Sequence, residues 1–430
     1  MVRILLVFWL FLLPATAVVA QETAGGQAET LGRSILEQEE ITLADLLQLA
    51  ELASPRLAAA YSGVQARAGR VKQAGLYPNP VIELAVGELS TDDTGDRKEK
   101  VSLVMPLVLG GRRGAAVAAA RVQQEAAAHW FDAARRDVFL RVHTLWAEQI
   151  YHREADQVFR ELLDVANHTL SIARARHDAR AAPESQVTRA LLEVYELEVA
   201  RDQQVAERVS GSAELSSLLG GLSVPVDRLI GALVPDGASI GEGLPTSSLE
   251  DHPALLAARR NVDAAEASLR EARAARIPDL SLSVAYGRNR ARDDGFVEAG
   301  VSMPLPVFDR NQGRVAETRS LAAQAHHHAR MVHGELESAV VAARQRHRSV
   351  RDQLQSMEGR ILPAAERGFA QATEGYRAGH LPFLELIDAQ RIHGNTRLRV
   401  LELRKALVIA EAELTSLVGA GPGEEREETP

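Results

Sequence analysis

The feature that most constrains this fold is an internal repeat, because the second half of the chain copies the first at a nearly constant offset. Met105-Pro106-Leu107 recurs as Met303-Pro304-Leu305, so the offset is 303 − 105 = 198. After one inserted residue near 308–312 the offset becomes 199, as for Pro183 and Pro382. The unit of about 180 residues is much longer than a solenoid repeat of roughly 20 to 50 residues. The sequence therefore predicts a duplicated unit rather than a solenoid.

The repeat divides the chain into two copies, at residues 41–220 and 239–419. We expect a linker between them at 221–238, a second linker before them at 21–40, and a disordered acidic tail at 420–430.

Residues 1–20 are typical of a secretory signal peptide. A short basic start precedes the apolar run of residues 4–13, and the small residues Val18-Val19-Ala20 precede Gln21. The alternative is a buried N-terminal helix. We expect an exported mature chain that begins near Gln21.

The composition excludes several classes of protein. The chain has no cysteine, so the exported protein has neither a disulfide nor a thiol for lipid attachment. Its net charge of −9 does not indicate the basic surface that a nucleic-acid-binding protein needs. We found no glycine-rich phosphate loop and no motif that brings Ser, His and acid together, so we expect neither an enzyme nor a cofactor.

Each copy shows the order helix, strand, strand, very long helix, turn, return helix. The predicted β-hairpins lie at 81–107 and 280–305, where apolar and polar residues alternate. Ser54-Pro55 predicts a break between two helices at the start of the first copy. One apolar face per strand fits a hairpin on a soluble core or a strand that faces lipid, and the pattern alone leaves both open.

The helical stretches are too long for an ordinary domain core. The stretch from Gly313 to Ala378 would span on the order of 100 Å. The return helix has a heptad seam typical of helices that lie side by side; its residues are Leu403, Leu407, Ala410, Leu414 and Leu417. We expect turns near 180–184 and 379–383, and long antiparallel helices that form a wall.

Four strands per chain are too few for a barrel, since about eight is the smallest number that closes. A membrane does not tolerate the open edges of a sheet. The hairpins of several copies must therefore close together. The predicted fold is mainly α, with a wall of long antiparallel helices, four β-strands per chain and two tandem repeats.

Several segments resemble the TolC-like outer-membrane efflux proteins. They are "ITLADLLQLAELASPRLAAA", "YPNPVIEL", "RIPDLSLS", "MPL" and, most specifically, "YRAGHLPFLELIDAQ" at 376–390. The resemblance covers roughly 41–419 and is nearest to the heavy-metal-efflux branch. It implies a homotrimer in the outer membrane, in which the strands of each chain make a small transmembrane β-barrel contribution and the helices form an α-barrel tunnel that extends into the periplasm. As the exit duct of a tripartite pump, it would work with a periplasmic adaptor and an inner-membrane transporter.

The resemblance also implies functional residues. Glu385 and Asp388, which share a helix face, would ring the periplasmic pore as a gate. The alternative is a solvated pair of acids at a helix start. The first copy departs from this pattern, because Gln186 and Arg189 replace the acids and Arg180 replaces Gly379.

Two further sets of residues are predicted. The tip turns, where an adaptor would dock, contain Tyr376, Gly379, Leu381, Pro382 and Pro183. The strand residues expected to face lipid are Leu282, Val284, Val301 and Met303, with Ser283 and Ser302 expected on the lumen side.

The second long helix contains a histidine cluster at 326–333, with His347 beyond it. The cluster consists of His326, His327, His328 and His333. No i, i+4 or i, i+3 pair exists inside the cluster, so we expect a solvated helix face and no metal site.

Two rival classes of protein remain: a periplasmic adaptor, which would need a flanking β-rich domain, and a coiled-coil scaffold of an export system.

Overall fold

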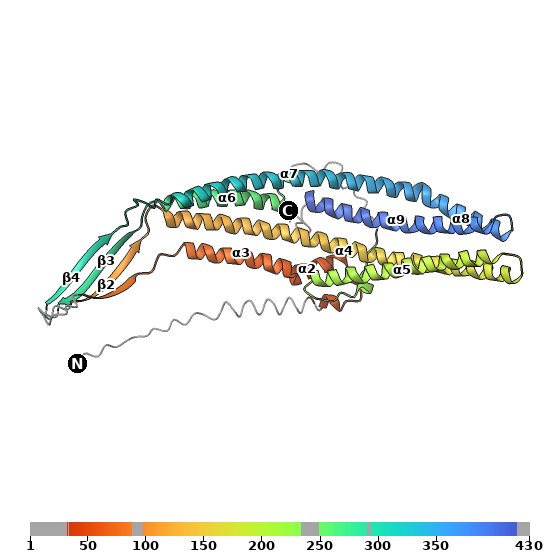
Figure 1. Cartoon of the computed structure of the whole chain (residues 1–430), viewed down its shortest axis with the longest axis horizontal. Coiled ribbons are helices and arrows are strands. Elements are labelled where there is room, and N and C mark those ends of the chain that lie inside the picture. The colour runs from red at the N-terminus through yellow and green to blue at the C-terminus, as the bar shows by residue number, and fades with distance from the viewer. Residues whose placement is uncertain (1–31, 33, 88–97, 234–248, 290–293, 419–430) are drawn as a thin grey trace, which may run out of the picture.

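The computed structural model describes residues 32, 34–87, 98–233, 249–289 and 294–418. The predicted signal peptide, the start of the linker at 21–40 and the predicted tail at 420–430 lie outside these residues. Figure 1 shows an elongated molecule with strands at one end, two helical turns at the other, and long helices between them. The predicted fold class is confirmed, with two helical repeats and one four-stranded antiparallel sheet. None of the helices described has the length and apolar character needed to cross a membrane.

The first repeat begins with α2 (Leu43–Ala53) and α3 (Pro55–Ala74). Thr42 and Asp45 form a capping box at the start of α2, and Ser54-Pro55 separates the two helices as predicted. Strands β1 (Val81–Gly87) and β2 (Lys98–Leu107) follow. The long helix α4 (Arg112–Asp178) and the return helix α5 (Glu184–Leu218) complete the repeat, and the 3₁₀ turn η1 (Val226–Arg228) lies in the linker that follows.

The second repeat has the same order: α6 (Pro253–Ala274), β3 (Leu280–Asn289), β4 (Asp294–Ser302), α7 (Gln312–Ser356), the π-helical turn η3 (Met357–Ile361), α8 (Leu362–Arg377) and α9 (Phe383–Val418).

The long helix of the second repeat differs from that of the first by its π-helical turn. This turn lies directly before Pro363, whose nitrogen has no hydrogen to donate to the preceding turn. The matching position in the first repeat is Asp164, and α4 continues through it without a break.

Each long helix is flanked by two shorter helices that follow one another along its length. Helices α3 and α5 lie along α4, and α6 and α9 lie along α7 and α8 (Figure 1). Helix α4 also contacts α6 and α9 of the second repeat, so the helices of the two repeats form one continuous wall.

The main core lies midway along the wall, where α2 and the linker between the repeats pack on α4. Leu46, Leu145, Ile150 and Leu229 are fully buried or nearly so. Ile35 is also buried in this core, so part of the predicted linker at 21–40 is packed against the first repeat. The part of the inter-repeat linker that the structure describes, residues 221–233, is thereby fixed to the middle of α4.

The sheet has the strand order β1-β2-β3-β4, and every pair is antiparallel. In this register Leu103 lies opposite both Ile82 and Val284, and Leu282 lies opposite Val301. One face is therefore apolar across all four strands. Ser302 of β4 pairs with Ser281 of β3. Residues two apart on a strand point to the same face, so Ser283 and Ser302 both lie on the face opposite the apolar one.

Candidate functional site: the helical tip and the two-faced sheet

The two tip turns have the same backbone geometry. In the first, the N–H groups of Arg180 and Ala181 donate to the carbonyl oxygens of His177 and Arg176, both at 2.8 Å. In the second, the N–H groups of Gly379 and His380 donate to Tyr376 and Gly375 at 3.1 and 2.8 Å. Both patterns are Schellman motifs, which end a helix with one left-handed residue.

The left-handed position differs between the two turns in its side chain. Gly379 has φ 76°, which glycine adopts without steric cost. Arg180 has φ 58°, a conformation in which Cβ crowds the following carbonyl. The first turn is therefore strained and the second is not.

The interior of the tip joins the two turns through aromatic contacts. The Tyr376 ring lies edge-on to Phe383, with 5.5 Å between the ring centroids. The Arg176 guanidinium of the first repeat lies over the same ring, 5.0 Å from its centroid. Because Tyr376 is only 5% exposed, its side chain supports the turn from inside and offers no surface for docking in this chain.

The other predicted tip residues lie nearer the solvent. Pro183, Gly379 and Pro382 are exposed, and Leu381 is half-buried over Gly375. A Cβ added to Gly375 would lie 2.6 Å from the Leu381 Cδ1 atom, so this glycine lets the turn fold back on α8.

The two predicted gate acids are exposed at the start of α9. The N–H of Glu385 donates to the Pro382 carbonyl at 3.1 Å, which places this carboxylate in the first helical turn. Asp388 follows one turn later. Within the described part of the chain neither carboxylate has an ion pair. Their first-repeat counterparts lie at the start of α5, where Gln186 is half-buried and Arg189 is exposed.

A charged contact further from the tip was not predicted. Arg391 of α9 donates to Glu193 and Glu196 of α5, at 2.9 Å each. The hydrogen bond to Glu193 raises the pKa of Arg391, so the guanidinium stays charged. Lys100 and Glu298 of the sheet are 198 residues apart, which is the repeat offset in that region, so opposite charges at repeat-related positions indicate this pair. Arg391 and Glu193 are also 198 residues apart, but the repeat offset there is 199, so no such signal marks them.

The sheet separates polar from apolar side chains. On the apolar face Leu282 is 40% exposed, Val284 59% and Val301 68%, so the single chain leaves this face uncovered. On the polar face Lys100 pairs with Glu298 across β3. The predicted Met303 is exposed but lies one residue beyond β4. The strand ends there because Pro304 and Pro306 follow, and proline cannot donate to a ladder.

The histidines do not form a metal centre. No cluster of three or more His, Cys, Asp or Glu side chains able to hold a metal ion occurs among the residues described. His326 and His333 lie at 3.2 and 3.6 Å from Glu266 and Glu250, respectively. The expected solvated face is correct for 326–328 but wrong for His347, which is buried beside Glu411.

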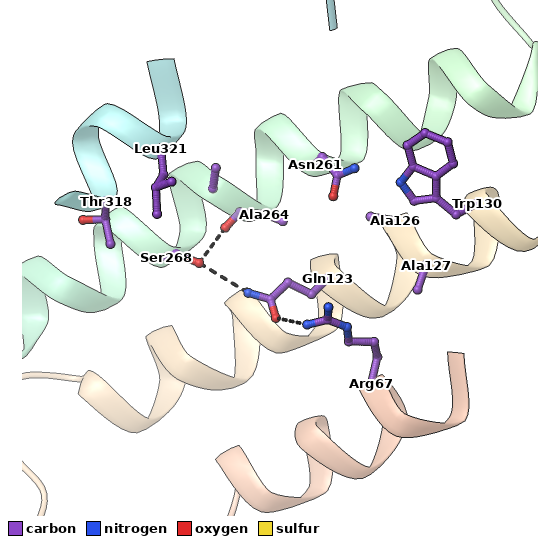
Figure 2. A pocket seen from close by; sticks show the side chains of 11 residues that line it. Arg67, Gln123, Ala126, Ala127, Trp130, Asn261, Ala264, Ser268, Thr318 and Leu321 are labelled. Atoms are coloured by element: carbon purple, nitrogen blue, oxygen red, sulfur yellow. Dashed lines mark hydrogen bonds between the residues drawn. The ribbon is translucent and has the colours of Figure 1, made fainter. Parts of the chain in front are cut away.

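A cavity lined by α3, α4, α6 and α7 lies in the half of the wall nearer the strands. Figure 2 shows Gln123 of α4 between Arg67 of α3 and Ser268 of α6, with hydrogen bonds of 3.3 and 3.4 Å. The bond between Gln123 and Ser268 joins the two repeats, so the wall acts as one unit between the sheet and the tip.

The family model for outer membrane efflux proteins matches residues 46–221 and again residues 244–420. The chain belongs to the outer membrane efflux protein family. The chain is also similar to two solved members of this fold. It superposes on the outer-membrane channel OprN with a TM-score of 0.78 at 18% identity, over 88% of this chain and 90% of that one. For CusC the TM-score is 0.74 at 20% identity, over 88% and 92%.

Two similar sequences carry names that refer to metals. The cobalt-zinc-cadmium resistance protein CzcC of Cupriavidus metallidurans is 27% identical over 393 residues, which are 91% of this chain and 92% of that protein. The nickel-cobalt-cadmium resistance protein NccC of Alcaligenes xylosoxydans xylosoxydans is 25% identical over 298 residues, and the match covers 64% of its length.

Family membership decides between the classes left open by the sequence. This outer membrane efflux protein is a non-enzymatic channel of the outer membrane that extends into the periplasm. The adaptor and scaffold alternatives are therefore wrong. TolC-like channels form trimers and work in tripartite pumps.

The strained turn generates a prediction. Replacing Arg180 with Gly should stabilise the first tip turn by about 1 kcal/mol, because glycine removes the left-handed strain. The matched change Gly379→Ala should destabilise the second turn by a similar amount. Amide hydrogen exchange at 176–184 and 375–383 measures both effects. Slower exchange in Gly379→Ala, or faster exchange in Arg180→Gly, would contradict the interpretation.

Proposed function

We propose that this chain is the outer-membrane exit duct of a tripartite efflux system, assembled as a homotrimer with a periplasmic adaptor and an inner-membrane transporter. One observation carries the proposal: the sheet is apolar over most of one face and lacks partners on the outer sides of β1 and β4 among the residues described. Lipid would leave the polar groups of those edges unsatisfied, so copies must pair edge to edge.

In this trimer the apolar face of the sheet meets lipid, with Leu282, Val284 and Val301 in the membrane. The face of Ser283 and Ser302 lines the lumen. The wall of helices continues the lumen into the periplasm and ends at the tip turns. The exposed Gly379, Pro382 and Pro183 provide the surface on which the adaptor docks.

Glu385 and Asp388 form the gate of this duct. Three copies around one axis would bring six exposed carboxylates together, and like charges at close range repel. Such a ring favours cations and opens when partner contacts separate the carboxylates. Neither carboxylate forms an ion pair within the described part of the chain, which supports this role. Arg391, one turn beyond Asp388 on α9, interacts with Asp388 through space without an ion-pair contact.

We further propose metal cations as the exported cargo. The support is the similarity to CzcC, a cobalt-zinc-cadmium resistance protein, over nine-tenths of both chains. The similarity to CusC, a cation efflux system protein of Escherichia coli, supports the same class of cargo.

The cargo proposal predicts restored tolerance in cells. A metal-sensitive strain that keeps its transporter and adaptor but lacks its duct should regain growth in Co²⁺, Zn²⁺ or Cd²⁺ when this chain is expressed. The Val284→Arg variant, which should not assemble, is the control. Growth no better than that of the control, with trimers present in the outer membrane, would exclude these cations as cargo.

The lipid face can be tested by paired substitutions on β3. Val284→Arg should cost about 2 to 4 kcal/mol at the membrane midplane, whereas Ser283→Arg on the opposite face should cost much less. The yield of assembled trimers in the outer membrane measures the difference. Equal yields from the two variants would count against the assignment of faces.

The gate can be tested by conductance. Replacing both Glu385 and Asp388 with Ala should reduce the cation preference of reconstituted trimers and weaken block by multivalent cations added on the periplasmic side. The matched double change at Gln186 and Arg189 should do neither. The alternative is that the two acids only stabilise α9, through the positive end of its helix dipole, by about 0.3 to 1 kcal/mol each. In that case the ion selectivity of the double Ala variant stays unchanged. That result in assembled trimers would remove the gate hypothesis.

A further inference from the structure

A buried amide near the tip has no hydrogen-bond partner. Gln390 of α9 is only 2% exposed, and neither its Oε1 nor its Nε2 atom is bonded to another described group. A buried polar group without a partner costs about 1 to 3 kcal/mol. A buried amide with that cost indicates that a group outside the chain satisfies it.

The amide lines a cavity of about 330 Å³ between α4, α5 and α9. Glu193, Glu196, Arg391 and Asn395 share this cavity, with Leu162 and Leu197 among the apolar residues around it. A water molecule takes about 30 Å³. The space therefore accommodates an ion together with several of its water molecules.

The charged groups of the cavity leave an excess of negative charge. The same Arg391 Nη2 atom lies 2.9 Å from an oxygen of Glu193 and 2.9 Å from an oxygen of Glu196. Two carboxylates thus converge on one cationic position. The Glu193 side chain is 6% exposed and cannot turn to solvent, whereas Arg391 is 50% exposed and can swing outward.

We infer that this cavity is a binding site for a hard divalent cation, held by carboxylate oxygens of Glu193 and Glu196 and by the Gln390 Oε1 atom. The donors are all oxygen, the set that Mg²⁺, Ca²⁺ and Mn²⁺ prefer. The ion takes the position between the carboxylates that the Arg391 nitrogen otherwise holds. Asn395, one turn beyond Arg391 on α9, offers a further amide oxygen, and water completes the shell.

The site lies on the seam between the repeats, because α5 belongs to the first and α9 to the second. When the ion binds, it replaces the hydrogen bonds of Arg391 as the contact that links α5 to α9. This inference does not depend on metals being the cargo, and it uses neither gate acid.

Manganese titration of the purified, detergent-solubilised trimer tests the site, with bound Mn²⁺ measured by electron paramagnetic resonance. The Glu385→Gln/Asp388→Asn background removes the tip acids, so that Mn²⁺ bound there is not counted. We expect one Mn²⁺ per chain to remain. Glu193→Gln should weaken its binding at least about tenfold, and Gln390→Leu should weaken it several-fold. Glu198→Gln, on the exposed side of the same helix, is the matched control and should leave the affinity unchanged.

The decisive variant is Arg391→Met, because an ion that competes with the guanidinium and a cavity that holds only water predict different results. If the ion competes with the guanidinium, removing Arg391 strengthens Mn²⁺ binding, and Mn²⁺ raises the Tm of this variant more than that of the unmodified chain. If the cavity holds only water, no Mn²⁺ binds in the background variant at millimolar concentration, and the inference is overturned. Weaker binding in Arg391→Met, or unchanged binding in both Glu193→Gln and Gln390→Leu, overturns it as well.

Discussion

The structure depends on one constraint: a membrane gives no water to the backbone groups at the edge of a sheet. One chain supplies four strands, with β1 and β4 on the outside, and their outer edges have no partner within the described chain. The apolar face cannot remain in water and the edges cannot remain in lipid. Pairing β1 of one copy with β4 of the next satisfies both conditions, and the helical wall below the sheet then follows the same axis.

The duplication explains how one chain builds this wall. Each repeat contributes a β-hairpin, a long helix and shorter helices beside it, and contacts between repeats make the two copies act as one. Gln123 joins them in the half nearer the sheet, Arg391 joins them near the tip, and Arg176 joins them at the turns. The repeats are nonetheless unequal, since only the second has a relaxed glycine turn and the two acids.

Local patterns in the sequence were enough to predict what local physics determines. Alternation placed Leu282 and Ser283 on opposite faces, and proline marked the helix break at Ser54-Pro55. The pairing of Arg391 with Glu193 and the burial of Gln390 could not be predicted in the same way. They depend on which helices lie side by side, and no periodicity within one helix encodes its neighbour's register. The strand end was misplaced: the second predicted hairpin runs to Leu305, whereas β4 ends at Ser302, because Pro304 cannot donate to a ladder.

Cross-linking between the sheet edges tests the central claim most directly, and a chain without cysteine makes it clean. One cysteine is placed in β1 at Leu84 and one in β4 at Ala299, both on the apolar face. A short bismaleimide is then added to outer membranes. The account predicts covalent dimers and trimers and nothing larger, with each single-cysteine chain giving neither. Chains that remain monomeric, or a ladder that continues beyond three copies, would contradict closure of the sheet around a threefold axis.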